Sequence, residues 1–377
     1  MALEKDEYIL PMHRNLGVFT TKEIPLYRLF SQFQGKPGGF TKGRDRSFHF
    51  GTNEYKIVGM ISHLGPQMGV ADGIALACKL GKEKKVTLVF TGDGGASEGD
   101  FHESVNTAAV WNLPVIFIVE NNGYGLSTPS SEQFRCTSFA DKGTGYGIEG
   151  VSIDGNNVIK VFETIKNLAE DLRENPRPVI LECVTFRMRG HEEASGTKYV
   201  PQEMFDVWGK KDPVNNFEKF LLEEGVLTNE LIEKTKAGIK LEIEDGLEIT
   251  FAELNPKPDT ELELREVYKP FSLSENNFNG DKKISMRLID AISNGMKLAM
   301  EKHPNLVLMG QDIADYGGVF KITEGFVNLF GKERVRNTPL CESAILGSGF
   351  GLSIKGFKAM VEMQFADFVS EGMTQIV

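Results

Sequence analysis

Residues 86–123 read VTLVFTGDGGASEGDFHESVNTAAVWNLPVIFIVENNG, and this stretch decides the fold. Two short apolar runs rich in β-branched residues, at 86–91 and 114–119, predict buried strands. Residues 97–111 between them predict a helix. Two buried strands joined by a helix indicate a parallel sheet with helices on both faces, which is the α/β class.

The same alternation of strands and helices continues on both sides of this stretch. Residues 150–153 and 178–186 predict two more strands, with an amphipathic helix at 158–173 between them. A charged helical arm and a linker rich in Glu, Asn, Pro and Ser follow, and a second α/β pattern begins near residue 284. The last residues, 371–377, predict the middle of a helix. We expect three parts: an α/β domain at 1–213, an arm and linker at 214–283, and a partial α/β domain at 284–377.

Composition and charge exclude several classes of protein. The net charge of −11 disfavours binding to a nucleic-acid backbone. No apolar run reaches the roughly 18–20 residues of a membrane span. The four cysteines lack metal-like spacing, and the charged N-terminus lacks an apolar signal region. We therefore expect a cytoplasmic protein with neither nucleic acid nor membrane as a partner.

Polar residues follow both central strands of the predicted sheet. Asp93 lies between two glycines after the first strand, and Asn122 follows the second. Ligands of open α/β sheets bind at the carboxyl ends of the strands, and carboxylate and amide oxygens suit Mg²⁺. The alternative is a simple turn with a solvated aspartate, but the pairing with Asn122 favours a metal site.

The sequence from 92 to 133, GDGGASEGDFHESVNTAAVWNLPVIFIVENNGYGLSTPSSEQ, resembles the cofactor motif of a known enzyme family. This family is the thiamine-diphosphate-dependent 2-oxo acid dehydrogenase decarboxylating component, α-type subunit, and its branched-chain members fit best. MHRNLGVFT, GFTKGRDRSFHFG, IVGMISHLGPQMG and FRMRGHEE extend the resemblance. From residue 284, GGVF, FGKERVRNTPLCE and FADF resemble the start of the β-type subunit.

The resemblance implies a thiamine-diphosphate-binding fold. A diphosphate-binding domain would precede a partial pyrimidine-binding domain on one fused chain, apparently truncated at both ends. Matched by position, Asp93, the side chain of Asn122 and the main-chain carbonyl of Tyr124 resemble the family's magnesium ligands. Gly94 and Gly95 would lie against the diphosphate.

Five further residues match family positions. Arg14 corresponds to a diphosphate-binding arginine, and Ser62 and Leu64 to the backbone that holds the aminopyrimidine ring. His191 corresponds to a loop histidine near the diphosphate and the reaction centre, and Glu342 to the glutamate that activates the cofactor. Each has a simpler alternative: a surface ion pair for Arg14, core packing for Ser62 and Leu64, an idle surface position for His191, and a helix N-terminal acid for Glu342.

The resemblance also implies an activity and partners. We expect an oxidoreductase that decarboxylates a 2-oxo acid, most readily a branched-chain one, and passes the acyl group to a lipoyl-bearing acyltransferase. Pyruvate or acetoin as substrate, and a non-catalytic cofactor-binding fragment, are the alternatives. Cofactor sites between copies would make the chain a homodimer. His13 departs from the family, which has Tyr there, and Glu192 follows His191 where animal members carry a regulatory serine.

Overall fold

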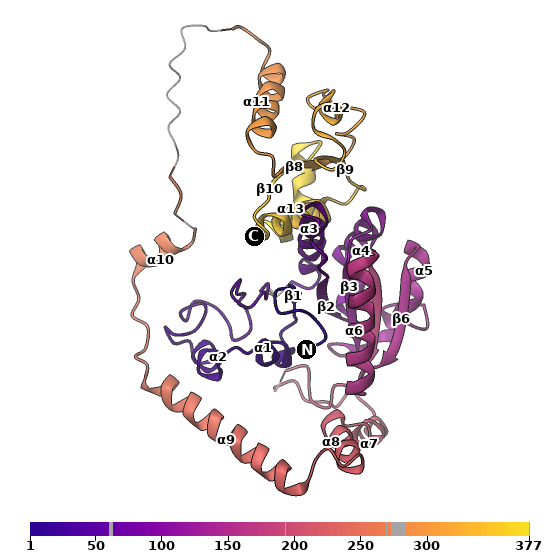
Figure 1. Cartoon of the computed structure of the whole chain (residues 1–377), viewed down its shortest axis with the longest axis vertical. Coiled ribbons are helices and arrows are strands. Elements are labelled where there is room, and N and C mark those ends of the chain that lie inside the picture. Colours follow the sequence, from indigo (N-terminus) through magenta and orange to yellow (C-terminus); the bar gives the residue numbers. More distant parts are fainter. Residues whose placement is uncertain (60–62, 193, 269, 273–283, 377) are drawn as a thin grey trace.

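The computed structural model describes residues 1–59, 63–192, 194–268, 270–272 and 284–376. Its larger sheet has five parallel strands in the order β1-β2-β3-β7-β6 (Figure 1). Their bounds are Ile9–Leu10, Thr87–Gly92, Val115–Asn121, Val179–Val184 and Glu149–Asp154, respectively. The strands expected at 86–91, 114–119, 150–153 and 178–186 are therefore confirmed.

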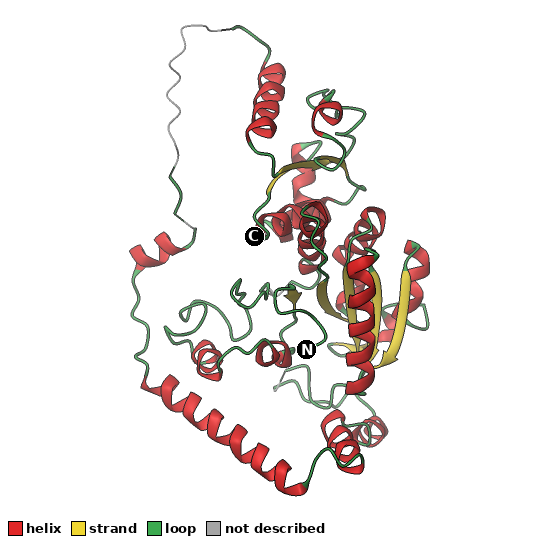
Figure 2. Ribbon diagram, in the orientation of Figure 1, coloured by secondary structure: helices red, strands yellow, loops and turns green. Residues whose placement is uncertain are grey.

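Helices cover both faces of this sheet, as expected for an α/β domain (Figure 2). Helices α3 (Gln67–Leu80) and α4 (Gly99–Trp111) share one hydrophobic cluster with Val89 and Phe117. Helix α6 (Val158–Glu174) shares a second cluster with Leu88 and Ile116. Neighbouring residues of one strand thus serve opposite clusters, because successive side chains of a strand point to opposite faces.

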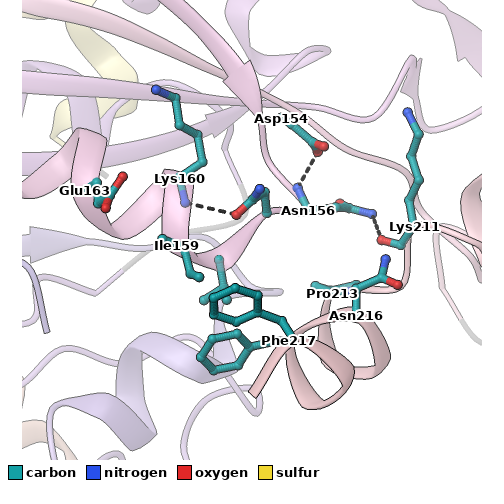
Figure 3. A pocket seen from close by; sticks show the side chains of 12 residues that line it. Asp154, Asn156, Ile159, Lys160, Glu163, Lys211, Pro213, Asn216 and Phe217 are labelled. Carbon is teal, nitrogen blue, oxygen red and sulfur yellow. Dashed lines mark hydrogen bonds between the residues drawn. The ribbon is translucent and has the colours of Figure 1, made fainter. Parts of the chain in front are cut away.

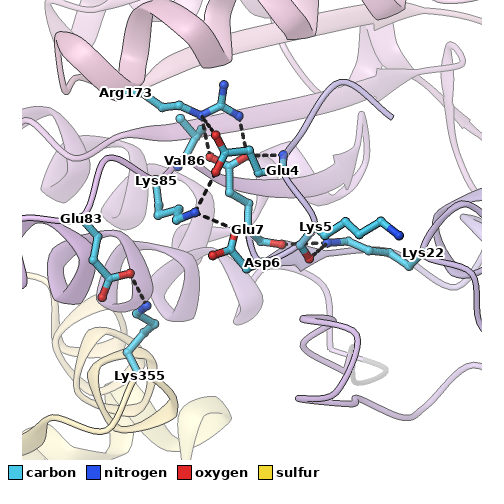
Figure 4. Close-up of polar contacts among 10 residues, drawn as sticks. All are labelled: Glu4, Lys5, Asp6, Glu7, Lys22, Glu83, Lys85, Val86, Arg173 and Lys355. Atoms are coloured by element: carbon cyan, nitrogen blue, oxygen red, sulfur yellow. Dashed lines mark hydrogen bonds and ion pairs between the residues drawn. The ribbon is translucent and has the colours of Figure 1, made fainter.

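Short elements and loops complete this first domain. The small hairpin of β4 (Tyr124–Gly125) and β5 (Thr128–Pro129) follows β3. Helices α1 (Leu16–Thr21), α2 (Leu26–Phe33) and α5 (Lys142–Tyr146) lie around the sheet. At the N-terminus, buried Glu7 accepts from Arg173 Nη2 at 2.7 Å and from Val86 N at 2.9 Å (Figure 4). These bonds anchor the chain start to the strand and helix that follow.

Helix α7 (Gln202–Gly209) lies at the end of the first domain, and the arm that follows consists of α8 (Pro213–Glu223), α9 (Asn229–Ala252) and α10 (Thr260–Glu266). Most of α9 is exposed, as expected, but its last turns pack on α2, where Thr250 Oγ1 donates to Tyr27 O at 3.1 Å. Helix α9 also runs three residues, Thr250–Ala252, into the segment 250–283 whose composition predicts a linker. The sequence pattern predicted a shorter helix than α9, because contact with α2 stabilises the end of the helix.

The second domain is built on a three-stranded parallel sheet in the order β10-β8-β9. Its strands are Lys358–Glu362, Leu306–Gly310 and Val335–Asn337, and its helices are α11 (Leu288–Lys302), α12 (Phe326–Phe330) and α13 (Glu342–Ile354). The expected helix at 371–377 is wrong in type, because Ala366–Gln375 forms a 3-10 helix. Strand β9 has only three residues, too few for a recognisable period.

The two domains meet through α3 and α13, which lie side by side (Figure 1). A Cβ atom added to Gly73 would fall well inside van der Waals contact of the Ser348 carbonyl oxygen, and one on Gly351 would do the same at Val70. Glycines therefore let the two backbones approach closely. At the far end of α13, Lys355 Nζ pairs with Glu83 Oε2 at 2.7 Å (Figure 4). Residues 347 and 351 of α13 thus pack directly against α3.

Candidate cofactor site

Asp93 lies directly after β2, at the carboxyl edge of the larger sheet, and is buried. Its Oδ2 accepts from Ser130 Oγ at 2.8 Å, and Asn122 Nδ2 lies 3.4 Å from its Oδ1. Burial raises the pKa of Asp93, and the Ser130 hydroxyl opposes that rise by favouring the carboxylate. The structure thus brings Asp93 and Asn122 together, as expected from the two strand ends.

Asn122 leaves one acceptor atom without a partner. Its Oδ1 is buried and has no hydrogen-bond donor among the described residues. A buried carboxylate beside a buried orphan amide oxygen fits a hard cation such as Mg²⁺. Tyr124, the third expected ligand, begins β4 two residues later. The described residues hold no group of three His, Cys, Asp or Glu around a metal position, so this site would rest on one carboxylate and neutral oxygens.

Gly94 and Gly95 lie where neighbouring segments approach their backbone closely. A Cβ on Gly94 would come within 3.0 Å of Gly125 Cα, and one on Gly95 would press on the Thr91 hydroxyl. The Cβ atom added to Gly95 would also lie 3.6 Å from Leu64 Cβ. Leu64 is 38% exposed, which argues against the alternative of simple core packing. Ser62 lies outside the described residues.

Arg14 and His191 meet across the edge of the sheet. Arg14 Nη2 donates to the carbonyl oxygen of His191. The turn that carries Arg14 is fixed by Asn15, whose Oδ1 accepts from Met12 N at 2.6 Å and whose Nδ2 donates to Glu120 Oε1 at 2.7 Å. Among the described residues Arg14 forms no ion pair with a carboxylate, so the alternative of a surface ion pair finds no support there.

The histidine loop is electrostatically unusual. Burial, then Arg14 and Arg187, lower the pKa of His191. The ring of His13 lies edge-on to His191 with centroids 6.3 Å apart, and burial beside Arg14 lowers the pKa of His13 to about 4. Both imidazoles are therefore neutral at neutral pH, and the positive charge of this region resides on the arginines.

Glu342 begins α13 on the second domain, where its Oε1 accepts from Gln311 Nε2 at 2.9 Å. The next two residues bond to α4 of the first domain: Ser343 Oγ donates to Asp100, and Ala344 N donates to Glu103 Oε2 at 3.1 Å. Glu103 thus caps a free N–H group of α13 from another domain. The expected acid therefore lies at the domain interface, with no direct contact to Asp93 recorded among the described residues.

Sequence reasoning missed three residues at this edge. Arg187 follows β7 and contacts the histidine loop, Glu120 is the residue before the last of β3 and accepts from Asn15, and Gln311 follows β8 and donates to Glu342. All three share one signal, a polar residue at or just after the carboxyl end of a buried strand. That signal alone does not distinguish a supporting residue from a ligand.

A separate hollow of about 390 Å³ lies where β6 ends and α6 begins (Figure 3). It is lined by polar groups of the β6–α6 loop, including Asn156 and Asn157, and by Phe217 of α8. None of the expected site residues lines it. This hollow therefore differs from the candidate cofactor site, whose residues lie between loops and domains.

Comparison with known proteins matches the two domains separately. The model of the dehydrogenase E1 component family matches residues 1–261. The model of the transketolase pyrimidine-binding domain matches residues 283–377. The matches follow one another in the order expected from the sequence.

Curated relatives match about seven tenths of this chain. Subunit alpha 1 of the mitochondrial 2-oxoisovalerate dehydrogenase of Arabidopsis thaliana is 34% identical over 73% of this chain and 58% of its own length. The human mitochondrial 2-oxoisovalerate dehydrogenase subunit alpha is 32% identical over 71% of this chain and 60% of its own. The alpha subunit of acetoin:2,6-dichlorophenolindophenol oxidoreductase of Bacillus subtilis is 34% identical over 71% of this chain and 79% of its own length. The chain thus spans about three fifths of the 2-oxoisovalerate dehydrogenase relatives.

Proposed function

Because the chain belongs to the dehydrogenase E1 component family, we propose that it catalyses thiamine-diphosphate-dependent oxidative decarboxylation of a 2-oxo acid. The acyl group would pass to a lipoyl group of a partner acyltransferase. A branched-chain 2-oxo acid is the favoured substrate, since two of the relatives described above are named 2-oxoisovalerate dehydrogenase subunits. The relative named for acetoin favours a second candidate, acetoin or pyruvate as substrate.

The observation that carries this proposal is the contact of α13 with α3 and α4. Glu342 begins α13, so this contact holds an acidic residue of the second domain against the domain that contains Asp93. A cofactor with an anionic end and a heteroaromatic end needs a cation site and a separate acid, and the two domains supply one each.

Asp93 and the side-chain oxygen of Asn122 would hold Mg²⁺ together with the main-chain oxygen of Tyr124. The partnerless Oδ1 of Asn122 supports this assignment, because a buried acceptor without a donor is costly unless a ligand satisfies it. Gly94 and Gly95 would leave room for phosphate oxygens against the backbone. Thiamine diphosphate, when bound, supplies the electron sink for loss of carbon dioxide.

Arg14, His191, Leu64 and Glu342 would act on the bound cofactor. Arg14 offers a fork of donors to an anionic oxygen, and neutral His191 lies beside it. Ser62 and Leu64 would hold the pyrimidine ring through their backbone. Glu342, oriented by Gln311, would hold a proton shared with a nitrogen atom of that ring.

The partners and location are also proposals. The acyltransferase carrying lipoyl groups is the partner that an E1 component requires, and a homodimer stays a prediction. A cytoplasmic location stays a prediction as well, since the names of the Arabidopsis and human relatives place those proteins in mitochondria. No helix in the described part of the chain is long and apolar enough to cross a membrane.

The test is a titration of the full chain with thiamine diphosphate, with and without Mg²⁺, in which calorimetry measures the binding. Oxidation of 2-oxoisovalerate, pyruvate or acetoin is then measured with 2,6-dichlorophenolindophenol as electron acceptor; the two 2-oxo acids lose carbon dioxide, whereas acetoin, which has no carboxyl group, is cleaved. We expect metal-dependent binding and fastest turnover of 2-oxoisovalerate. Binding without turnover of any substrate would favour the non-catalytic fragment, and absence of binding would contradict both.

A paired variant tests the role of Glu342. Glu342→Gln should fold and bind the cofactor but lose proton exchange at the thiazolium carbon, because an amide does not share that proton. NMR in deuterium oxide measures the exchange. Glu371→Gln, an exposed glutamate of the same domain, is the matched control and should exchange at the original rate. Unchanged exchange in Glu342→Gln would remove Glu342 from the mechanism.

A further inference from the structure

Arg187 joins two loops that flank the candidate site. It lies three residues beyond β7, and its Nη2 donates to Leu126 O at 2.5 Å and to Tyr199 Oη at 2.7 Å. Its Nη1 lies 3.4 Å from His191 Nδ1. One guanidinium therefore holds the loop after the β4 strand and the loop that carries His191.

The chemistry of this contact restricts the histidine. A guanidinium has only donors and stays protonated at every ordinary pH, so the ring nitrogen that faces it has to accept. A neutral imidazole whose Nδ1 accepts carries its hydrogen on Nε2. We propose that Arg187 is a positioning residue that fixes His191 as the Nε2–H tautomer, so that His191 presents a neutral N–H donor to an anionic oxygen. The identity of that oxygen rests on the proposed function, whereas the tautomer does not.

Most of the surroundings of His191 oppose a second proton on its ring. Arg14 contacts its main chain, Arg187 faces its ring, His13 lies edge-on to it, and Glu192 follows it. Burial opposes a second proton on the ring most strongly, the two guanidinium groups add to this effect, and Glu192 favours the proton. His191 is thus held as a neutral donor and not as an imidazolium acid.

Arg187 also stabilises strained and packed parts of both loops. Leu126, whose carbonyl accepts from it, has a φ of 59°, a left-handed conformation that costs a non-glycine residue free energy. Tyr199, its other acceptor, packs edge-on against Tyr124 with ring centroids 5.7 Å apart. The segment of the expected metal ligand Tyr124 and the segment of His191 therefore share one support.

The tautomer is directly measurable in the full chain without cofactor. Histidine labelled with ¹⁵N in the ring gives different shifts for protonated and unprotonated nitrogens, and the chain has six histidines. His191→Gln identifies the signal by its disappearance. At pH 7.5 we expect an unprotonated Nδ1 and a protonated Nε2. An Nδ1–H tautomer, or a doubly protonated ring, would overturn the proposal.

Variants test whether Arg187 is the cause. Arg187→Met removes every donor at similar length and should give a mixture of tautomers, while Arg187→Lys keeps a charged donor and should restore part of the wild-type pattern. Arg265→Met, an exposed arginine of the arm, is the control and should leave the pattern unchanged. Circular dichroism confirms folding of each variant. An unchanged Nε2–H signal in folded Arg187→Met would refute the positioning role.

Added ligands then show which oxygen accepts the hydrogen bond from the Nε2–H group of His191. Thiamine diphosphate with Mg²⁺ is added first and 2-oxoisovalerate second, and the Nε2 proton shifts with the ligand that accepts it. His191→Gln, which can retain an N–H near Nε2, should bind that ligand about tenfold more tightly than His191→Asn, whose amide lies nearer Nδ1. Equal affinities would contradict the donor role. Failure of turnover would leave the tautomer measurement in the cofactor-free chain intact.

Discussion

Single residues at the carboxyl edge of the larger sheet combine buried acceptors with neutral donors. Asp93 and Asn122 provide the acceptors, and burial raises the pKa of Asp93. Arg14 and Arg187 supply positive charge on one side of His191. A divalent cation near Asp93 would reverse the effect of burial, because it favours the carboxylate. This edge is therefore arranged for a cation and an anion together.

Asp93→Ala should weaken binding of thiamine diphosphate in the presence of Mg²⁺ by more than about a hundredfold, because it removes the charged ligand of the expected set. Isothermal calorimetry of the full chain at several Mg²⁺ concentrations measures this. Asp154→Asn, at the end of β6 on the same edge, is the control and should bind normally. If Asp93→Ala keeps wild-type affinity, the metal assignment is wrong.

At the scale of elements, the contact between α3 and α13 is the feature that joins the two domains. Its glycines leave no room for side chains. At the N-terminal end of α13, Glu103 of α4 accepts from Ala344 N, and Asp100 of α4 accepts from the Ser343 hydroxyl. Asp72 lies fully buried in α3, and neither of its carboxyl oxygens has a partner among the described residues. The interface thus combines close packing with one buried titratable group.

Gly73→Ala should lower the free energy of unfolding by about 1–3 kcal/mol, because its methyl group would collide with the Ser348 carbonyl of α13. Urea unfolding followed by fluorescence measures this. The control is Gly238→Ala in α9, where nothing lies within 4 Å of the added Cβ. That change should raise stability by about 0.5–1 kcal/mol. Equal effects at the two positions would show that α3 and α13 do not pack as described.

Asp72 should make stability fall as the pH rises. Burial raises its pKa well above the usual range, so the folded chain binds this proton more tightly than the unfolded chain does. Its contribution is fully present below about pH 4, where the unfolded carboxyl is also protonated, and is lost as the pH rises through the folded pKa. The slope is at most about 1.4 kcal/mol per pH unit.

Asp72→Asn removes this titration and should flatten the dependence of unfolding free energy on pH between 5 and 8. Exposed Asp245→Asn is the control and should retain the wild-type slope. The measurement is urea unfolding at several pH values. A wild-type slope in Asp72→Asn would mean that Asp72 is not the group responsible.

On the scale of the whole molecule, both domains that would enclose the cofactor meet within one chain. The resemblance implied sites between copies, whereas α13 contacts α3 and α4 of its own chain. Helices α9 and α10 of the arm lie on the outside of the first domain (Figure 1). Each chain would therefore carry a complete set of the expected site residues, whether or not it dimerises.

Mixing Asp93→Ala with Glu342→Gln tests this arrangement. Each variant lacks a residue from a different domain, so a site formed within one chain stays defective in every molecule, and the mixture should show no more activity than the separate variants. Co-expression before purification allows exchange of subunits. Recovery of activity in the mixture would show that Glu342 serves the Asp93 of another copy.

The sequence by itself determined the strands of the larger sheet and the residues at their ends. Short apolar runs are local signals, and residues such as Asp93 and Asn122 meet because the ends of parallel strands meet. Tertiary structure alone decided that Arg187 faces His191 and Leu126, that Glu120 holds Asn15, and that α13 packs on α3. These contacts join residues far apart in sequence, and their free energy depends on packing and charge across loops that no local pattern describes.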